Sequence, residues 1–126
     1  MPKKPIKTDN APAAIGPYSQ GIISGNLLFT SGQLPIDSAT GKIPETDIED
    51  HAHQVFKNLG AIAEAAGTSL DKVVKTTVFL SDIANFQAVN QVYAQYFKEP
   101  FPARSAFQVA SLPLGADIEV EAVIEL

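Results

Sequence analysis

Hydrophobic positions recur with a helical period in two parts of the chain. Between residues 48 and 66 apolar side chains return every three or four positions, at Val55, Leu59, Ile62, Ala63 and Ala66. This spacing predicts an α-helix with one buried face. Thr46 or Asp47 can cap its start, and Gly67 suits its end.

A second helix is predicted to begin after Asp82, which can cap it. Its apolar stripe consists of Phe86, Val89, Val92, Tyr93, Tyr96 and Phe97. Pro100 and Pro102 follow the stripe and are expected to end the helix, because proline lacks the amide hydrogen that a helix interior needs.

Strand patterns surround these helices. Residues 18–33 hold two runs of strand-forming residues around the turn-forming triplet SGN, which predicts a β-hairpin. The β-branched segment 71–80 and the segments 103–109 and 117–126 predict three more strands. Residues 34–46 contain two prolines and indicate a loop, in which residues 42–44 have the composition of a short strand.

The order of these elements predicts an α+β fold, with one mixed six-stranded sheet and two helices packed on one face. The strand–helix–strand unit around the second helix is expected to be a parallel crossover. A chain of 126 residues, of which 45% are hydrophobic, has the usual size of one domain. We therefore expect residues 1–126 to form a single domain, with residues 1–10 as a short segment that leads into it.

The other face of this sheet is predicted to be half apolar. In the strand 73–80, alternation points Val74, Thr76, Val78 and Leu80 to one side and Val73, Lys75, Thr77 and Phe79 to the other. The second set mixes apolar and polar residues. Two helices cover only one face of a six-stranded sheet, so the mixed face favours a closed oligomer of identical chains.

Charge and composition exclude several classes of protein. The net charge of −5, with lysines scattered along the chain, argues against a nucleic-acid binder. The chain has no cysteine, which excludes disulfides, thiolate metal sites and a cysteine nucleophile. No apolar run approaches the roughly 20 residues that cross a bilayer, and residues 1–14 lack the apolar core of a signal peptide. A cytoplasmic protein without a membrane segment is expected.

The two histidines do not predict a metal site. His51 and His53 are two positions apart, which places them roughly 200° apart around a helix, so they cannot share one ion. They are interpreted as ordinary residues of the helix surface. The glycines match no phosphate-binding loop, and no serine lies in a GxSxG motif.

The only arginine, Arg104, lies in the stretch FPARSAF. Alternation points Arg104 away from Phe107, and it points Glu119 away from the apolar set of the last strand. If both apolar sets pack under the helices, Arg104 and Glu119 share the other face. Two interpretations stay open on spacing alone: a cross-strand salt bridge, or an anion-binding guanidinium that faces a carboxylate able to hold water and exchange protons.

Five motifs resemble those of the RidA (YjgF) family of reactive-intermediate deaminases, from about Ala11 to the C-terminus. They are IGPYSQG, SGQLP, VKTTVFLSD, FQAVNQVY, and FPARSAFQVASLP followed by IEVEA. The resemblance implies a chorismate-mutase-like subunit in a homotrimer with clefts between subunits. It also implies hydrolysis of enamines and imines, such as 2-aminoacrylate, 2-iminopropanoate and 2-iminobutanoate, to 2-keto acids and ammonia without a cofactor.

The resemblance also assigns roles to residues. Arg104 corresponds to the arginine that grips the substrate carboxylate, and Glu119 to the glutamate that orients the attacking water. The expected substrate-binding residues are Tyr18, Ser31, Gly32, Asn90, Ser105 and Ala106, together with Arg104. Many relatives carry cysteine where this chain has Ala106, which counts against a thiol-dependent role but not against hydrolysis.

Two alternatives remain beside the deaminase. The same arginine-lined cleft suits a non-enzymatic module that binds keto acids, and some relatives are described as ribonucleases or translation inhibitors. The acidic charge and the lack of a positioned histidine count against a ribonuclease. The pair of Arg104 and Glu119 favours an enzyme, because a sensor has less need of a water-holding carboxylate.

Overall fold

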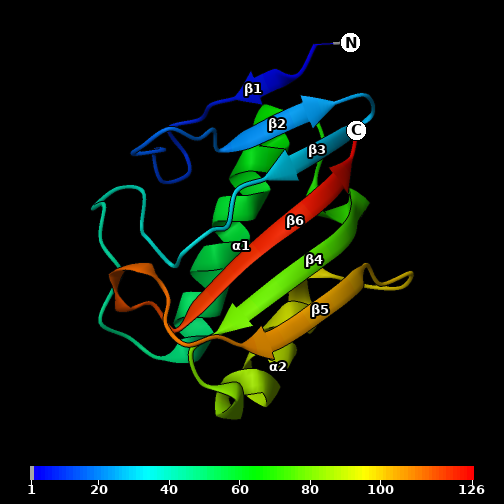
Figure 1. Ribbon diagram of the computed structural model, residues 1–126. Helices are drawn as coiled ribbons and strands as arrows, with labels where there is room; N and C mark the ends of the chain where they lie inside the picture. The colour runs from blue at the N-terminus through cyan, green and yellow to red at the C-terminus, as the bar shows by residue number, and fades with distance from the viewer. Residues whose placement is uncertain (1) are drawn as a thin grey trace.

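The two amphipathic stripes form the two helices of the structure, a computed structural model that describes residues 2–126. Helix α1 spans Ile48–Ala65 and helix α2 spans Phe86–Tyr96. The side chain of Asp47 caps α1 by accepting a hydrogen bond from the backbone N–H of Asp50 at 2.9 Å. Both helices pack against the same face of the sheet, behind the strands in Figure 1. Within residues 2–126, neither helix is long and apolar enough to cross a membrane.

Six strands form one mixed sheet in the order β1-β2-β3-β6-β4-β5. Their bounds are β1 Lys4–Ile6, β2 Gly21–Ser24, β3 Leu27–Thr30, β4 Val73–Leu80, β5 Ala103–Gln108 and β6 Ile118–Glu125. Only β4 and β5 pair in parallel, because α2 joins them as a crossover, and every other pair is antiparallel. The expected α+β fold with two helices on one face is confirmed.

The hydrophobic core fills the space between the helices and the sheet. Phe56 and Leu59 of α1 are completely buried against Leu28 of β3 and Ile124 of β6, which belong to the same cluster. Residues of β6 alternate between this core and the opposite surface, which we call the open face. The core therefore fixes which side chains of each strand reach the open face.

The sixth strand differs from the one expected. Residues 42–44 form no strand, and Lys42 makes only an isolated bridge with Asp37. The missing strand is β1, which lies in the segment predicted to lead into the domain. It pairs with β2, and its last residue, Ile6, is only 7% exposed because it packs into the core. One buried isoleucine fixes a segment whose lysines indicated a solvated tail.

The predicted alternation of β4 fails at its first two residues. The register against β6 shifts between Val73 and Lys75, which marks a β-bulge. Val73 therefore belongs to the core and is 7% exposed, while Val74 is 43% exposed, the reverse of the expectation. Beyond the bulge, Thr76 points to the core and Phe79 to the open face, as predicted.

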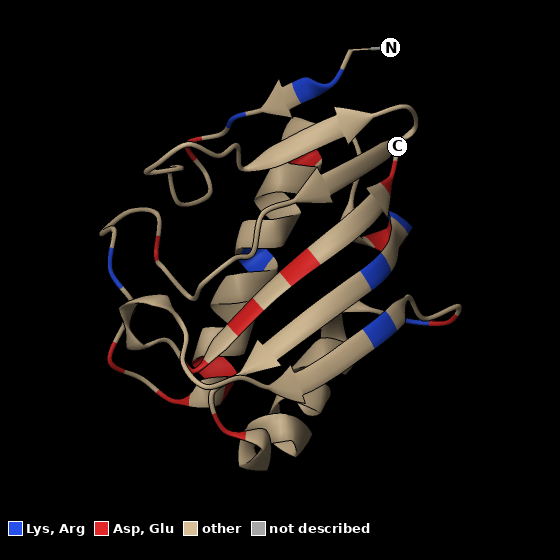
Figure 2. Cartoon of the chain, viewed as in Figure 1, with Lys and Arg blue, Asp and Glu red and all other residues tan. Residues whose placement is uncertain are grey.

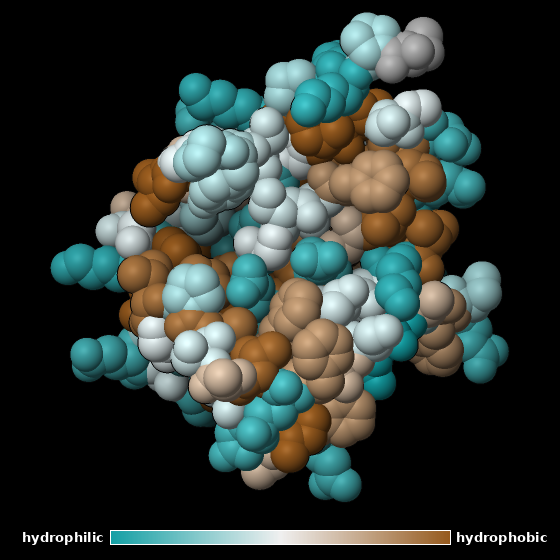
Figure 3. All heavy atoms as spheres, in the orientation of Figure 1, coloured by the Kyte–Doolittle hydropathy of each residue, from teal (hydrophilic) through white to brown (hydrophobic). Residues whose placement is uncertain are grey.

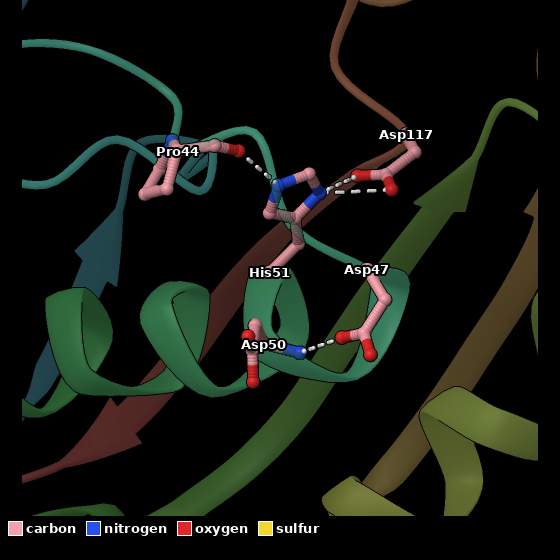
Figure 4. A network of polar contacts seen from close by, with 5 residues as sticks. All are labelled: Pro44, Asp47, Asp50, His51 and Asp117. Atoms are coloured by element: carbon pink, nitrogen blue, oxygen red, sulfur yellow. Dashed lines mark hydrogen bonds and ion pairs between the residues drawn. The ribbon is translucent and has the colours of Figure 1, made fainter.

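The histidines are not ordinary surface residues, so that interpretation is wrong. His51 is buried and donates from Nε2 to the carbonyl oxygen of Pro44 at 2.7 Å, while its Nδ1 lies 2.8 Å from a carboxylate oxygen of Asp117 (Figure 4). Burial, the largest influence, lowers the pKa of His51, but the hydrogen bonds to Pro44 and Asp117 and the nearby negative charges together raise it. The imidazole thus ties the loop after β3 to the start of β6, and in its protonated form it donates from both nitrogens.

His53 has a separate partner, since its Nδ1 lies 2.8 Å from the hydroxyl oxygen of Tyr96 on α2. The two histidines therefore serve two different contacts. Among residues 2–126, no group of three or more histidine, aspartate and glutamate side chains is arranged to hold a metal ion.

Candidate functional site

A cavity of about 510 Å³ lies beside the start of β6. Four residues singled out in the sequence line it, namely Tyr18, Ser31, Gly32 and Glu119. We call these four residues the glutamate cluster. They come from three separate parts of the chain, which the pairing of β2, β3 and β6 brings together.

Glu119 supplies the charge of this cavity. Its side chain is half-buried on the open face, and burial raises the pKa of its carboxyl group, with a further rise from the negative charge of Glu121. Among residues 2–126, the contact between His51 and Asp117 is the only ion pair within 4 Å, so Glu119 has no cationic partner. A carboxylate with a raised pKa and no ion pair is suited to exchange protons with a bound water molecule.

Gly32 leaves the space that this carboxylate occupies. A Cβ atom added at Gly32 would overlap Oε2 of Glu119 and lie 2.8 Å from its Cδ. Gln33, the next residue, is held in place by backbone hydrogen bonds to Val120 in both directions, at 2.8 and 3.1 Å. The close approach of this segment to β6 thus requires glycine at position 32.

Two polar side chains in the lining of the cavity, Ser31 and Gln20, fix the segment around Tyr18. Ser31 donates from its hydroxyl group to the carbonyl oxygen of Ser19 at 2.6 Å, which ties the end of β3 to the segment that carries Tyr18. Gln20 is buried, and its amide group donates to the carbonyl oxygens of Thr8 and Pro12 at 3.0 and 2.8 Å. The sequence analysis missed Gln20, although its place in the YSQG motif was a signal for it.

Arg104 is held by helix α2. Its Nη1 donates a hydrogen bond to Oδ1 of Asn90 at 2.7 Å. Its guanidinium carbon lies 4.8 Å from the ring centre of Tyr93 and 5.3 Å from that of Phe86, which are cation–π distances. Tyr93 is fixed in turn, because its hydroxyl lies 2.8 Å from that of the buried Thr76. The guanidinium is thus oriented, while its other donors remain at an exposed surface.

Arg104 and Glu119 lie on opposite faces of the sheet, so the expectation that they share one face is wrong. Arg104 pairs with Thr76, which points to the helices, whereas Glu119 pairs with Phe79, which points to the open face. Phe107 also points to the open face, where its ring meets that of Phe79 at a centroid distance of 5.3 Å. A salt bridge between Arg104 and Glu119 within one chain is therefore excluded.

The physical reason lies in what covers each side of β5. The side of β5 with Phe107 was expected to pack under the helices because it is more apolar. Instead Phe107 pairs with Phe79 outside the core, and the aromatic rings of α2 cover the stem and charge of Arg104. An edge strand leaves room for this arrangement, because no further strand within residues 2–126 pairs beyond β5.

The neighbours of Arg104 divide between the two faces. Ala106 pairs with the buried Val78 and lies on the side of α2. Ser105 points to the open face, where its hydroxyl accepts a hydrogen bond from Nζ of Lys75 at 3.3 Å. We call Asn90, Arg104 and Ala106 the arginine cluster. Figure 2 shows the separation of charge, with acidic bands on β6 and basic bands on β4 and β5.

Comparison with known proteins agrees with this geometry. The family model described as Endoribonuclease L-PSP matches residues 8–126. The human protein 2-iminobutanoate/2-iminopropanoate deaminase is 48% identical, over 96% of this chain and 88% of its own. The solved structure of a Rid-family protein from Yersinia pestis superposes with a TM-score of 0.97 at 49% identity, covering 99% of this chain and 100% of that one. The structure of E. coli TdcF with bound serine superposes with a TM-score of 0.92 at 44% identity, covering 98% of each chain.

Proposed function

The chain belongs to the RidA (YjgF) family, whose model matches residues 8–126, and from this premise we propose that it is a hydrolytic deaminase. Its substrates are the reactive enamines and imines 2-aminoacrylate, 2-iminopropanoate and 2-iminobutanoate, and its products are 2-keto acids and ammonia. The observation that carries the proposal is the unpaired, half-buried carboxylate of Glu119 in a cavity that Gly32 keeps open. The human relative with 48% identity is named for this reaction.

The site is proposed to form between subunits of a homotrimer. One chain separates the arginine cluster from the glutamate cluster by the thickness of the sheet, so a site that uses both needs a second copy. The open face supports such an assembly, because Phe29 and Phe107 are both 44% exposed on it. Figure 3 shows apolar side chains spread over this face among polar ones. Exposed apolar area of this kind favours burial against another chain.

In the proposed mechanism, Arg104 binds the carboxylate of the substrate through two parallel hydrogen bonds. Asn90, Tyr93 and Phe86 hold the guanidinium in place, so the substrate is oriented when it binds. Tyr18, Ser31 and Gly32 form the wall beside the reacting carbon, and Ser105 and Ala106 flank the arginine. Asn90 acts chiefly through Arg104, because its Oδ1 accepts from the guanidinium.

Glu119 acts on the water molecule. It accepts a proton as the water oxygen forms a bond to the imine carbon, and the electron pair of the C=N bond moves to nitrogen, which takes up a proton. A further proton is then transferred to the amino nitrogen of the resulting carbinolamine, the C–N bond breaks with release of ammonia, and the hydroxyl group loses its proton as the C=O bond forms. 2-Aminoacrylate enters this sequence after protonation at its terminal carbon, which converts it to 2-iminopropanoate. The raised pKa of Glu119 suits a group that must both accept and return a proton.

A decisive experiment generates 2-aminoacrylate in situ with a pyridoxal-phosphate-dependent dehydratase and follows its loss with and without the protein. Wild type is expected to accelerate the loss, and Glu119→Gln and Arg104→Ala are expected to abolish most of the acceleration. A protein that binds pyruvate but does not accelerate the reaction would be a binding module. Cleavage of RNA is the further control, because the matching family model is described as an endoribonuclease.

The homotrimer, the single domain over residues 1–126 and a cytoplasmic location are parts of the same proposal. Light scattering tests the trimer, limited proteolysis tests the single domain, and cell fractionation tests the location.

A further inference from the structure

The cavity that holds Glu119 has a second wall that the proposed reaction leaves unused. Ile15, Leu34, Ile36, Pro113 and Leu114 line it, and we call these residues the apolar wall. Two of them are unusually open, since Ile15 is 84% exposed and Leu114 is 72% exposed. 2-Iminopropanoate offers such a wall only a methyl group.

Leu114 is held in a backbone conformation that disfavours leucine. Its φ of 59° and ψ of 21° lie in the left-handed region, and it is the only residue other than glycine with a positive φ among residues 2–126. The turn is closed by a hydrogen bond from the backbone N–H of Ala116 to the carbonyl oxygen of Pro113 at 3.1 Å. Glycine or asparagine would adopt this conformation at lower cost.

Two features of Leu114 thus oppose stability: the backbone is strained, and the apolar side chain faces solvent. Strain of this kind is concentrated at sites that bind ligands. The side chain also lines the same cavity as Glu119, so a ligand bound at Glu119 is within reach of the apolar wall. Apolar side chains gather at the left of Figure 3, where the segment before β6 and the segment after β3 lie (compare Figure 1).

We propose that Leu114 and Ile15 determine specificity by binding the side chain of the substrate, so that the protein prefers 2-imino acids with extended apolar side chains over 2-aminoacrylate. This inference rests on the proposed deaminase function and names the substrate class of the same site. The 2-imino acid formed from leucine is a suitable representative. Its branched side chain buries apolar area against Leu114 and Ile15, whereas 2-aminoacrylate has only a methylene group to place there.

The test compares two substrates in the full-length protein. An L-amino-acid oxidase, with catalase to remove peroxide, generates the imine of leucine, and a dehydratase generates 2-aminoacrylate. A semicarbazide trap reports how much of each imine escapes hydrolysis. The quantity measured is the ratio of kcat/KM for the leucine-derived imine to kcat/KM for 2-aminoacrylate, in wild type, Leu114→Ala, Ile15→Ala and Ile83→Ala. Ile83 is the matched control, because it is 48% exposed and lies outside the lining of this cavity.

We expect wild type to favour the leucine-derived imine, and Leu114→Ala to lower the ratio about tenfold. Ile15→Ala is expected to lower it by a smaller factor, and Ile83→Ala to leave it unchanged. Alanine keeps a Cβ atom at position 114, so Leu114→Ala retains most of the backbone strain and removes mainly the side-chain contact. The affinity for 4-methyl-2-oxopentanoate, the stable product from the leucine-derived imine, should fall in parallel while that for pyruvate stays the same.

Four results would overturn the inference. If wild type hydrolyses 2-aminoacrylate but has no preference for the larger imine, the deaminase proposal stands and this inference fails. The same conclusion follows if Leu114→Ala slows both substrates equally, or if it changes the size of the oligomer, since Leu114 would then belong to the contact between copies. If wild type hydrolyses neither imine, the proposed function fails and this inference falls with it.

Discussion

Replacing Gly32 by alanine tests the role of Glu119 without touching any polar group. The new Cβ atom would overlap Oε2 of Glu119 and would lie 2.8 Å from Cδ and 3.1 Å from Cγ. Ordinary contacts of a Cβ atom are 3.4–4 Å, so the carboxylate must move by roughly an ångström. A displacement of that size at a reacting group can cost about a hundredfold in rate, which corresponds to about 2.7 kcal/mol in the activation barrier.

The stability of the fold should change little in Gly32→Ala. Gly32 has no positive φ, so alanine can adopt its backbone conformation, and the loss of freedom in the unfolded chain stabilises by about 0.4–1 kcal/mol. Rotation of the Glu119 side chain away from its present position costs about 0.5–1.5 kcal/mol. The two effects nearly cancel, so the free energy of unfolding should stay within about 1 kcal/mol of wild type.

The assay measures kcat for 2-aminoacrylate hydrolysis, urea denaturation and oligomer size for Gly32→Ala beside a matched control, Gly60→Ala. Gly60 lies in α1, and a Cβ atom there would make only an ordinary contact of 3.7 Å with Leu70. The control should gain about 0.5–1 kcal/mol of stability, because glycine is unfavourable in a helix, and should keep full activity. A Gly32→Ala protein with the kcat of wild type would refute the reasoning, since the position of the carboxylate would then not matter for turnover.

Three further predictions follow from the pKa shifts and the arginine cluster. Glu119→Gln should be more stable than wild type at pH 7 and should turn over far more slowly. Because the pKa of Glu119 is raised in the folded protein, ionisation of this carboxyl group destabilises the fold; this effect is absent below about pH 4.3 and grows as pH rises through the raised pKa. Equal stability of the two proteins at pH 7 would contradict the prediction. Arg104→Lys keeps the charge but loses the proposed pair of hydrogen bonds to the substrate carboxylate and the stacking on Tyr93. It should lower kcat/KM roughly tenfold to a hundredfold and leave the oligomer intact. Full activity would show that the guanidinium does not bind the substrate carboxylate in this way. The pKa of His51 is raised, so its stabilising contribution should be complete below about pH 6.5 and lost as pH rises through the raised pKa. The thermal unfolding temperature of His51→Gln should therefore differ from that of wild type most at low pH. A difference independent of pH would refute the stabilising role of the protonated imidazole.

The elements of the fold could be predicted wherever a hydrophobic period ran long enough. The stripes of α1 and α2 cover several turns each, and the cap at Asp47 follows from its side chain. Strand β1 could not be predicted in this way, because three residues contain no full alternation and only the burial of Ile6 fixes them. The bulge at Val74 could not be predicted either, because a run of β-branched residues looks the same with or without one inserted residue.

The roles that the resemblance assigns to the site residues stay a prediction, but part of their placement can be compared with the structure. Tyr18, Ser31, Gly32 and Glu119 line one cavity. The face of Arg104 could not be read from alternation, because the pattern tells which residues share a side and not which side the helices cover. The same limit applies to His51, whose helical position was clear but whose partner, Asp117, lies 66 residues further along the chain.

Opposite placement of the two charges has a physical consequence for the monomer. If Arg104 and Glu119 faced each other within one chain, their ion pair would lower the pKa of the carboxyl group, and Glu119 would be a weaker base. Instead, burial raises the pKa of the Glu119 carboxyl group, and the guanidinium of Arg104 contacts Asn90 and Tyr93 of α2. The proposed site between subunits would then bring an anionic substrate between the two groups, so that the substrate carboxylate, and not Glu119, neutralises the arginine. Glu119 remains a base in that arrangement. Burial of its carboxylate without an ion pair lowers the stability of each chain, and the same burial leaves the carboxylate able to accept a proton from water.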